Sequence, residues 1–205
     1  MKLILPFITI VSGVPRSGTS MMMKVLEAGG MGILADNVRG ADSDNPNGYY
    51  EYEPVKRTRS DHRWTLNAEG RAVKVVHLLL HHLPRDKQYR VIFIHRDLQE
   101  VVASQQKMLR NLKKQGASLS DEELALALGT QVEKTLTWVR RQGNMQLLEV
   151  HYSKMIADPL SEIARVAELI SAPLDLHAMT CVVDSSLYRQ RHMESEKIDS
   201  QLRNL

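Results

Sequence analysis

The stretch GVPRSGTS at residues 13–20 lies between the apolar run Phe7–Val11 and an apolar stretch with helical spacing that continues to Ala28. A glycine, four intervening residues and a second glycine at the junction of a strand and a helix form the frame of a phosphate-binding loop. Backbone amides and the helix dipole favour an anion at such a helix N-terminus. The sequence therefore predicts a phosphate site at this loop.

The loop differs from that of nucleoside triphosphatases. Thr19 occupies the position where those enzymes carry a lysine, and the fixed cation is Arg16 inside the loop. The planar guanidinium of an arginine can bind two oxygens of one anion. The apolar strands end in His77 and in His95-Arg96, so no carboxylate stands where a magnesium-binding aspartate is expected. These features predict a phosphate anhydride held without an obligatory metal.

Further apolar segments continue the alternation of strand and helix. Short runs rich in β-branched and other apolar residues predict strands, and helical periodicity predicts helices, one of which begins at Ser120 with a capping box formed with Glu123. The predicted strands are 72–77, 90–95 and 146–151, and the predicted helices are 98–114, 120–141 and 159–170. This order predicts an α/β fold in three layers, with a central parallel sheet flanked by helices.

Length and composition narrow the function classes. The chain has 205 residues, which predicts one domain over 1–205, and 27 basic against 24 acidic residues give a net charge of +3. That excess is too small to indicate a nucleic-acid partner. Cys181 is the single cysteine, so an internal disulfide is impossible. No apolar run reaches the ~20 residues of a membrane span, and we expect a cytoplasmic protein.

A second candidate anion site follows the strand 90–95. Arg96 comes directly after that strand, where ligands of open α/β sheets bind, and Ser104 lies eight residues later on the following helix. An arginine and a hydroxyl at this offset are suited to a second phosphate. The alternative is structural: Arg96 pairs with Asp97, and Ser104 bonds back to its own helix.

Together the two segments resemble the sulfotransferase superfamily, whose donor is 3′-phosphoadenosine 5′-phosphosulfate (PAPS). The resemblance implies that the loop, through Pro15, Arg16, Ser17, Gly18, Thr19 and Ser20, holds the 5′-phosphosulfate. It also implies that Arg96 and Ser104 hold the 3′-phosphate. Two weaker similarities imply that Tyr152 lies near the adenine and that Arg189 contacts the 3′-phosphate.

The resemblance covers roughly residues 4 to 190 and is closest to short bacterial members of the family. It implies a P-loop NTPase-like fold and a sulfotransferase that passes the sulfuryl group of PAPS to a hydroxyl or amine, releasing adenosine 3′,5′-bisphosphate (PAP). The acceptor class stays open among small molecules, glycans and peptides, and a homodimer is compatible with the sequence. Two other functions remain: a P-loop kinase that depends on magnesium, and a non-catalytic protein that binds PAPS or PAP.

Three residues are candidates for the base that takes the acceptor's proton. Glu51 and Glu53 follow a turn-rich segment and lie among tyrosines, an environment that suits a carboxylate base. Several sulfotransferases are similar in that they use a glutamate from such a loop. His77 ends the strand 72–77, near the position of a catalytic histidine in cytosolic relatives. We favour Glu51. Lys74, on the same strand, is either a donor-binding cation or a solvent-facing lysine.

Overall fold

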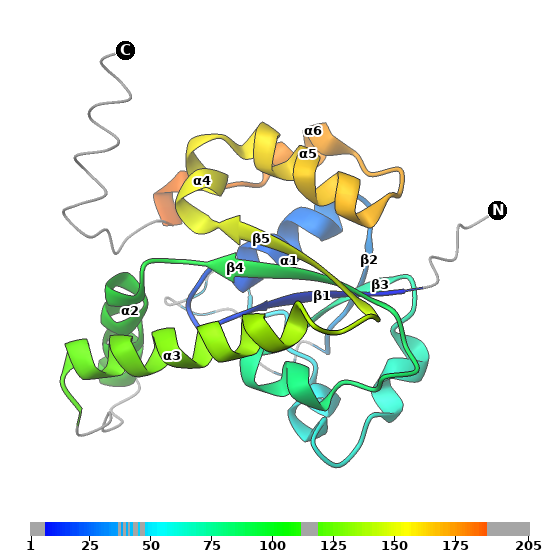
Figure 1. Ribbon diagram of the computed structural model, residues 1–205. Helices are drawn as coiled ribbons and strands as arrows, with labels where there is room; N and C mark the ends of the chain where they lie inside the picture. The colour runs from blue at the N-terminus through cyan, green and yellow to red at the C-terminus, as the bar shows by residue number, and fades with distance from the viewer. Residues whose placement is uncertain are drawn as a thin grey trace.

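The computed structural model describes residues 7–187, except 37, 39, 41, 43–44, 46–47 and 112–118. Its centre is a five-stranded sheet in the order β2-β3-β1-β4-β5, in which every pair of neighbours is parallel (Figure 1). The strands are β1 Ile8–Gly13, β2 Gly32–Leu34, β3 Arg71–Lys74, β4 Tyr89–His95 and β5 Met145–His151. Their carboxyl ends therefore meet at one edge of the sheet.

Helices cover both faces of the sheet (Figure 1). One face carries α1 Thr19–Ala28, α4 Tyr152–Ala157, α5 Pro159–Ile170 and α6 Leu176–Cys181. The other carries α2 Leu98–Asn111 and α3 Asp121–Val139, with the 3-10 helices η1 Glu53–Arg57, η2 Arg63–Asn67 and η3 His77–His82; η4 Ser185–Leu187 follows α6. This arrangement confirms the predicted three-layer α/β fold.

The central strand shows why the sequence folds this way. Every residue of β1 is buried, and its side chains alternate between two cores. Ile8 and Ile10 pack in the core that includes Leu136 of α3, whereas Val11 packs in the core that includes Met22 of α1. A strand covered on both faces needs apolar side chains in both directions, which explains the nearly continuous apolar run.

The element boundaries correct one prediction that bears on the site. The strand expected over 72–77 ends at Lys74, and His77 instead begins η3. The edge strand β2 was not predicted because it has three residues and follows a glycine-rich stretch. The short helices α4 and α6, of six residues each, were also missed.

The predicted capping box at the start of α3 is confirmed. The Glu123 backbone N–H donates to Ser120 Oγ at 3.2 Å, and the Ser120 N–H donates to Glu123 Oε2 at 2.8 Å. Residues 112–114, the end of the helix predicted over 98–114, lie outside the described part of the chain. Within that part, no helix combines the length and apolarity needed to cross a bilayer.

Candidate functional site

A pocket of about 390 Å³ opens at the carboxyl edge of the sheet. The chain leaves β1 toward β2 and β3 on one side and later adds β4 on the other, and such a switch point is where open α/β sheets bind ligands. The lining residues are Gly13, Val14, Pro15, Arg16, Gly18, Thr19, Ser20, Met21, Asn45, Tyr49, Glu51, Tyr52, Val55, Lys56, Lys74, Val75, Val76, Leu79, Arg96, Ser104, Lys107, Met108 and Tyr152.

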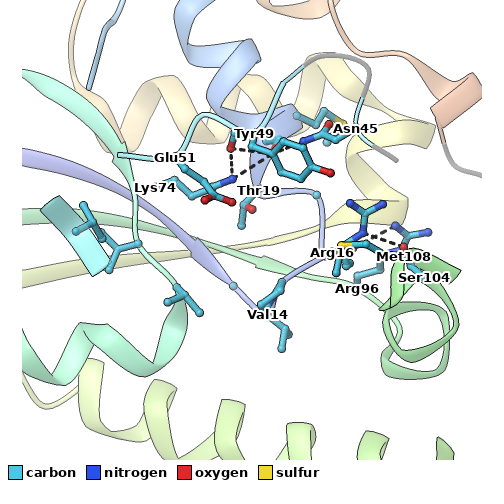
Figure 2. Close-up of a pocket in the computed structure, with 18 of the residues that line it drawn as sticks. Val14, Arg16, Thr19, Asn45, Tyr49, Glu51, Lys74, Arg96, Ser104 and Met108 are labelled. Atoms are coloured by element: carbon cyan, nitrogen blue, oxygen red, sulfur yellow. Dashed lines mark hydrogen bonds between the residues drawn. The ribbon is translucent and has the colours of Figure 1, made fainter. Parts of the chain in front are cut away.

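The pocket has two ends that differ in construction (Figure 2). We define the arginine end by Arg16, Arg96, Ser104 and Tyr152. We define the glutamate end by Tyr49, Glu51, Lys56 and Lys74. Five cations but a single carboxylate, Glu51, line the pocket as far as the chain is described, so its charge suits an anionic ligand.

Gly18 lets the loop pass close to Tyr152. It is the N-cap of α1 and has a φ of 104°, a conformation that costs little only for glycine. A Cβ atom at this position would lie 2.7 Å from Tyr152 Cε2. Gly18 has no side chain to cap this helix N-terminus, and Gly18, Thr19 and Ser20 all line the pocket. The first turn of α1 therefore has the features of an anion site.

Arg16 turns toward α2. Its backbone has a φ of 78°, unusual for a residue with a side chain, and its Nε donates to Ser104 Oγ at 3.0 Å. The sequence motifs pair Ser104 with Arg96, but the structure joins it to Arg16. A serine hydroxyl that accepts from Arg16 keeps its own proton, which it can donate to a further acceptor.

Several contacts hold Arg96 in place. Its Nε donates to Glu100 Oε2 at 2.9 Å, and its NH1 donates to the Arg16 carbonyl at 3.3 Å. Its guanidinium carbon lies 4.7 Å from the centre of the Tyr152 ring, a cation–π contact. The structure therefore brings Arg16 and Arg96 to one end of one pocket (Figure 2), and the contact with Arg96 places Tyr152 there as well. The alternative in which Arg96 pairs with Asp97 is not what the structure shows, because the carboxylate that Arg96 bonds is Glu100.

The other loop residues divide into two groups. Pro15, Thr19 and Ser20 line the pocket, and Ser20 Oγ donates to the Tyr49 carbonyl at 3.2 Å. Ser17 does not belong to the described lining: its N–H closes the loop by donating to the Val14 carbonyl at 3.1 Å. Its Oγ is buried and finds no partner among the described residues. Ser17 therefore shapes the loop from behind.

Lys74 resolves the alternative left open by the sequence. Its Nζ donates to Ser20 Oγ at 3.2 Å and to the Tyr49 carbonyl, so the side chain points into the pocket (Figure 2). Lys74 is the last residue of β3, which pairs with β1, and this places it next to the loop. Lys56 and Lys107 also line the pocket. The sequence did not indicate this, because Lys56 lies on the 3-10 helix η1 and Lys107 on a later turn of α2.

The candidate base Glu51 lines the glutamate end. Its side chain is 24% exposed, and its Oε2 lies 3.1 Å from Lys56 Nζ. Lys56 also donates to Glu53, and its hydrogen bonds to Glu53, and to a lesser degree to Glu51, raise the pKa of Lys56. Glu53 is not among the described lining residues. Of the two carboxylates, only Glu51 reaches the pocket.

His77 is placed differently from the sequence prediction. Because β3 stops at Lys74, the His77 side chain lies in the core, 1% exposed, and not in the described lining of the pocket. Its Nδ1 lies 3.3 Å from the Gly13 carbonyl, and its Nε2 lies 3.4 Å from Gln131 Oε1. Burial lowers the pKa of His77, which these two hydrogen bonds partly offset. The structure therefore favours a supporting position under the loop.

Two further predictions concern residues at the margins of the site. Tyr152 lines the pocket, as described above. Arg189 lies outside the described residues. Among the described residues, no cluster of three or more His, Cys, Asp or Glu side chains is arranged to hold a metal ion.

A family model described as "Sulfotransferase domain" matches residues 8–201. The chain belongs to the sulfotransferase family. This confirms the family indicated by the two motifs. No curated protein sequence matches the chain significantly.

Solved sulfotransferase structures share the fold at low sequence identity. Mouse sulfotransferase SULT7A1, complexed with PAP, matches 86% of this chain and 63% of its own with a TM-score of 0.58 at 17% identity. Retinol dehydratase, in complex with androsterone and PAP, matches 89% of this chain and 64% of its own with a TM-score of 0.51 at 20% identity. This sulfotransferase-family chain thus spans less than two thirds of those two proteins.

A bacterial structure matches more of its own length. The sulfotransferase domain of the Synechococcus PCC 7002 olefin synthase aligns over 92% of this chain and 82% of its own, with a TM-score of 0.53 at 15% identity. At such identities the likeness establishes the fold, and the roles of individual residues must come from the site itself.

Proposed function

We propose that this sulfotransferase-family protein transfers the sulfuryl group of PAPS to a hydroxyl or amine acceptor and releases PAP. The observation that carries the proposal is the convergence of Arg16 and Arg96 in one pocket, next to the N-terminus of α1 with its glycine N-cap. A donor with phosphates on both its 5′ and 3′ sides needs two cationic contacts. The PAP complexes of the mouse enzyme and of retinol dehydratase support this donor class.

The residues around the loop are suited to the 5′-phosphosulfate. Charge builds on the departing phosphate during in-line transfer, and preorganised donors aimed at it lower the barrier. In this proposal the amides of the first turn of α1, Arg16 and Lys74 supply those donors. Thr19 and Ser20 add hydroxyls, whereas Ser17 contributes to the shape of the loop because its side chain is buried behind it.

The arginine end is suited to the 3′-phosphate. Arg96 supplies the charge, and Ser104 can donate its hydroxyl proton to a phosphate oxygen while it still accepts from Arg16 Nε. The Tyr152 ring, next to Gly18 and Arg96, offers an aromatic face to the adenine. In this proposal Ser104 contacts both Arg16 and the 3′-phosphate, so the 5′-phosphosulfate and 3′-phosphate subsites are direct neighbours.

Glu51 is the proposed general base. The acceptor oxygen or nitrogen forms a bond to sulfur, the bond from sulfur to the bridging phosphate oxygen breaks, and its electron pair leaves with PAP. The acceptor's proton passes to the Glu51 carboxylate. Because Glu51 lines the pocket beside Lys74, this proposal places proton removal and charge stabilisation at adjoining positions.

Calorimetric titration tests the donor class. We expect PAP to bind without added metal and ATP with magnesium to bind far more weakly. Removing the 3′-phosphate, by titrating adenosine 5′-monophosphate, and replacing Arg96→Ala should each cost about 100-fold in affinity, because each removes one charge-assisted contact. Arg96→Lys keeps the positive charge at this position. The control is Arg165→Ala, which removes an ion-paired arginine outside the described pocket lining.

The outcomes separate the three functions. Tighter binding of ATP with magnesium than of PAP would indicate a kinase and contradict the proposal. PAP binding without any sulfuryl transfer from PAPS across hydroxyl and amine acceptors would indicate a non-catalytic binding protein. Metal-independent PAP binding together with transfer supports the proposal.

A further inference from the structure

Glu100 is a buried carboxylate on α2 for which the proposed reaction has no role. It is 2% exposed and lies outside the described pocket lining. Burying a carboxylate in the protein interior is costly in free energy unless a cation pairs with it. That cation is Arg96: in this ion pair the Arg96 side chain is 8% exposed and the Glu100 side chain 1%.

The position of Glu100 on α2 directs its carboxylate toward Arg96. Glu100 and Ser104 lie four residues apart on one side of α2, and Arg96 lies four residues before Glu100, just ahead of the helix. The Asp97 carboxylate accepts from the N–H groups of Gln99 at 2.9 Å and Glu100 at 3.0 Å, which fixes the first turn. Glu100 therefore has a defined position between the two predicted 3′-phosphate ligands.

The contacts of Arg96 fix the guanidinium in direction as well as place. Glu100 holds its Nε, the Arg16 carbonyl accepts from NH1, and the Tyr152 ring lies against its face. A planar guanidinium held at two nitrogens and across one face has little rotational freedom. Of these contacts, the one with Glu100 is an ion pair.

We propose that Glu100 is a positioning residue, which orients Arg96 toward the 3′-phosphate of the donor. This inference rests on the proposed function, since it concerns the donor's 3′-phosphate. It also makes a prediction opposite in sign to simple electrostatics. A carboxylate near an anion site opposes anion binding, so removing it would tighten binding if its charge alone mattered. If Glu100 acts by positioning, removing it weakens binding.

Two substitutions separate position from charge. Glu100→Gln removes the charge but keeps an oxygen that can accept from Arg96 Nε. Glu100→Asp keeps the charge but withdraws the carboxylate by one methylene. We expect Glu100→Asp and Glu100→Ala to lose about tenfold in PAP affinity, and Glu100→Gln to stay within about threefold of wild type.

The matched control is Glu162→Ala. Glu162 is also a buried helical glutamate, 6% exposed and 2.6 Å from Arg165, but it lies on α5 outside the described pocket lining. Each variant is titrated with PAP and with adenosine 5′-monophosphate, and thermal unfolding verifies its folding. Positioning of Arg96 predicts that the loss appears with PAP and is below about twofold with the monophosphate, and that Glu162→Ala changes neither affinity.

Four results would overturn the inference: unchanged or tighter PAP binding by Glu100→Asp, a tenfold loss confined to Glu100→Gln, an equal loss for both nucleotides, or the same loss in Glu162→Ala. If Glu100→Ala does not fold, the comparison of Asp with Gln still decides. Failure of the wild-type protein to bind PAP would refute the proposed function as well. Binding by the wild type with no difference among the variants would refute the role of Glu100 alone.

Discussion

The arginine end and the glutamate end of the pocket are built from different kinds of structure. At the arginine end, Arg96 and Tyr152 directly follow strands, Ser104 lies on α2, and Arg16 lies in the loop between β1 and α1; the Arg96 side chain is 8% exposed and is held by polar and cation–π contacts. At the glutamate end, Glu51 and Lys56 are 24% and 54% exposed, and η1 is the regular element found among the described residues between β2 and residue 57.

The glutamate end is instead tethered by hydrogen bonds to distant parts of the chain. Lys74 and Ser20 both donate to the Tyr49 carbonyl, and the Asp36 N–H donates to the Glu51 carbonyl at 3.1 Å. The difference suits the proposed roles: the donor needs a preformed anion site, and the acceptor side must accommodate a second substrate. Substitutions at each end of the pocket can test this division.

Glu51→Gln tests whether the glutamate end carries the proton transfer. A general base contributes roughly 10²- to 10⁴-fold to a rate, so we expect kcat to fall by that factor. Because Glu51 lies away from the arginine end, the PAP affinity should stay within about twofold of wild type. Turnover with PAPS and calorimetry with PAP measure the two quantities.

Glu53→Gln is the control for that substitution. Glu53 also bonds Lys56 but is not among the described pocket-lining residues, so its replacement should leave kcat within about threefold. A similar fall of kcat in both variants would show that loss of the Lys56 ion pairs, and not of a base, is responsible. Loss of PAP affinity in Glu51→Gln would contradict the division into two ends.

A pair of glycine substitutions compares how tightly the two ends are packed. Gly18 and Gly48 both have positive φ, 104° and 81°, so alanine at either position carries a backbone cost of about 1–2 kcal/mol. Only at Gly18 would the new methyl group also collide with the Tyr152 ring; at Gly48 no described atom lies within 4 Å. We expect Gly18→Ala to lose about 3 kcal/mol of unfolding free energy and Gly48→Ala about half of that.

Denaturant unfolding measures these two losses, and PAP titration adds an independent readout. Gly18→Ala should also weaken PAP binding because it displaces either the loop or the Tyr152 ring. Equal destabilisation by the two substitutions would mean that the loop yields at the arginine end as easily as at the glutamate end.

The same contrast explains which parts of the site the sequence could predict. Arg16, Arg96 and Tyr152 stand at fixed distances from strand ends, and parallel strands bring those ends to one edge, so their convergence follows from the order of elements. The family and the three-layer fold were predictable for the same reason. The short edge strand β2 was not, because three residues after a glycine-rich stretch carry no periodic pattern.

Three features of the site depend on three-dimensional contacts that residue spacing in the sequence does not reveal. The partner of Ser104 is Arg16 because the Arg16 backbone adopts a φ of 78°, which no sequence pattern indicates for an arginine. His77 was placed wrongly at a strand end because apolar residues continue past Lys74 while the strand pairing stops there. Lys74 was left undecided because a lysine within the predicted strand 72–77 can face either the ligand or solvent.

His77 provides the last and smallest test, because it separates a residue that supports the loop from one that performs the chemistry. Burial lowers the pKa of His77, so the folded protein holds this imidazole neutral where the unfolded chain, with an ordinary pKa near 6.5, already binds a proton. The unfolded state therefore binds more protons as the pH falls through 6.5, and the stability contributed by neutral His77 is lost in that direction.

We expect His77→Gln to reduce the decline in unfolding temperature between about pH 7 and pH 5, by a few degrees at most. The exposed His62→Gln serves as control for the removal of a histidine. A supporting role further predicts that kcat in His77→Gln stays within about tenfold of wild type, since glutamine can still donate to the Gly13 carbonyl under the loop. A fall of kcat as large as that in Glu51→Gln would move the proton transfer from the glutamate end to the core beneath the loop, where the pocket described by this structure gives the acceptor no access.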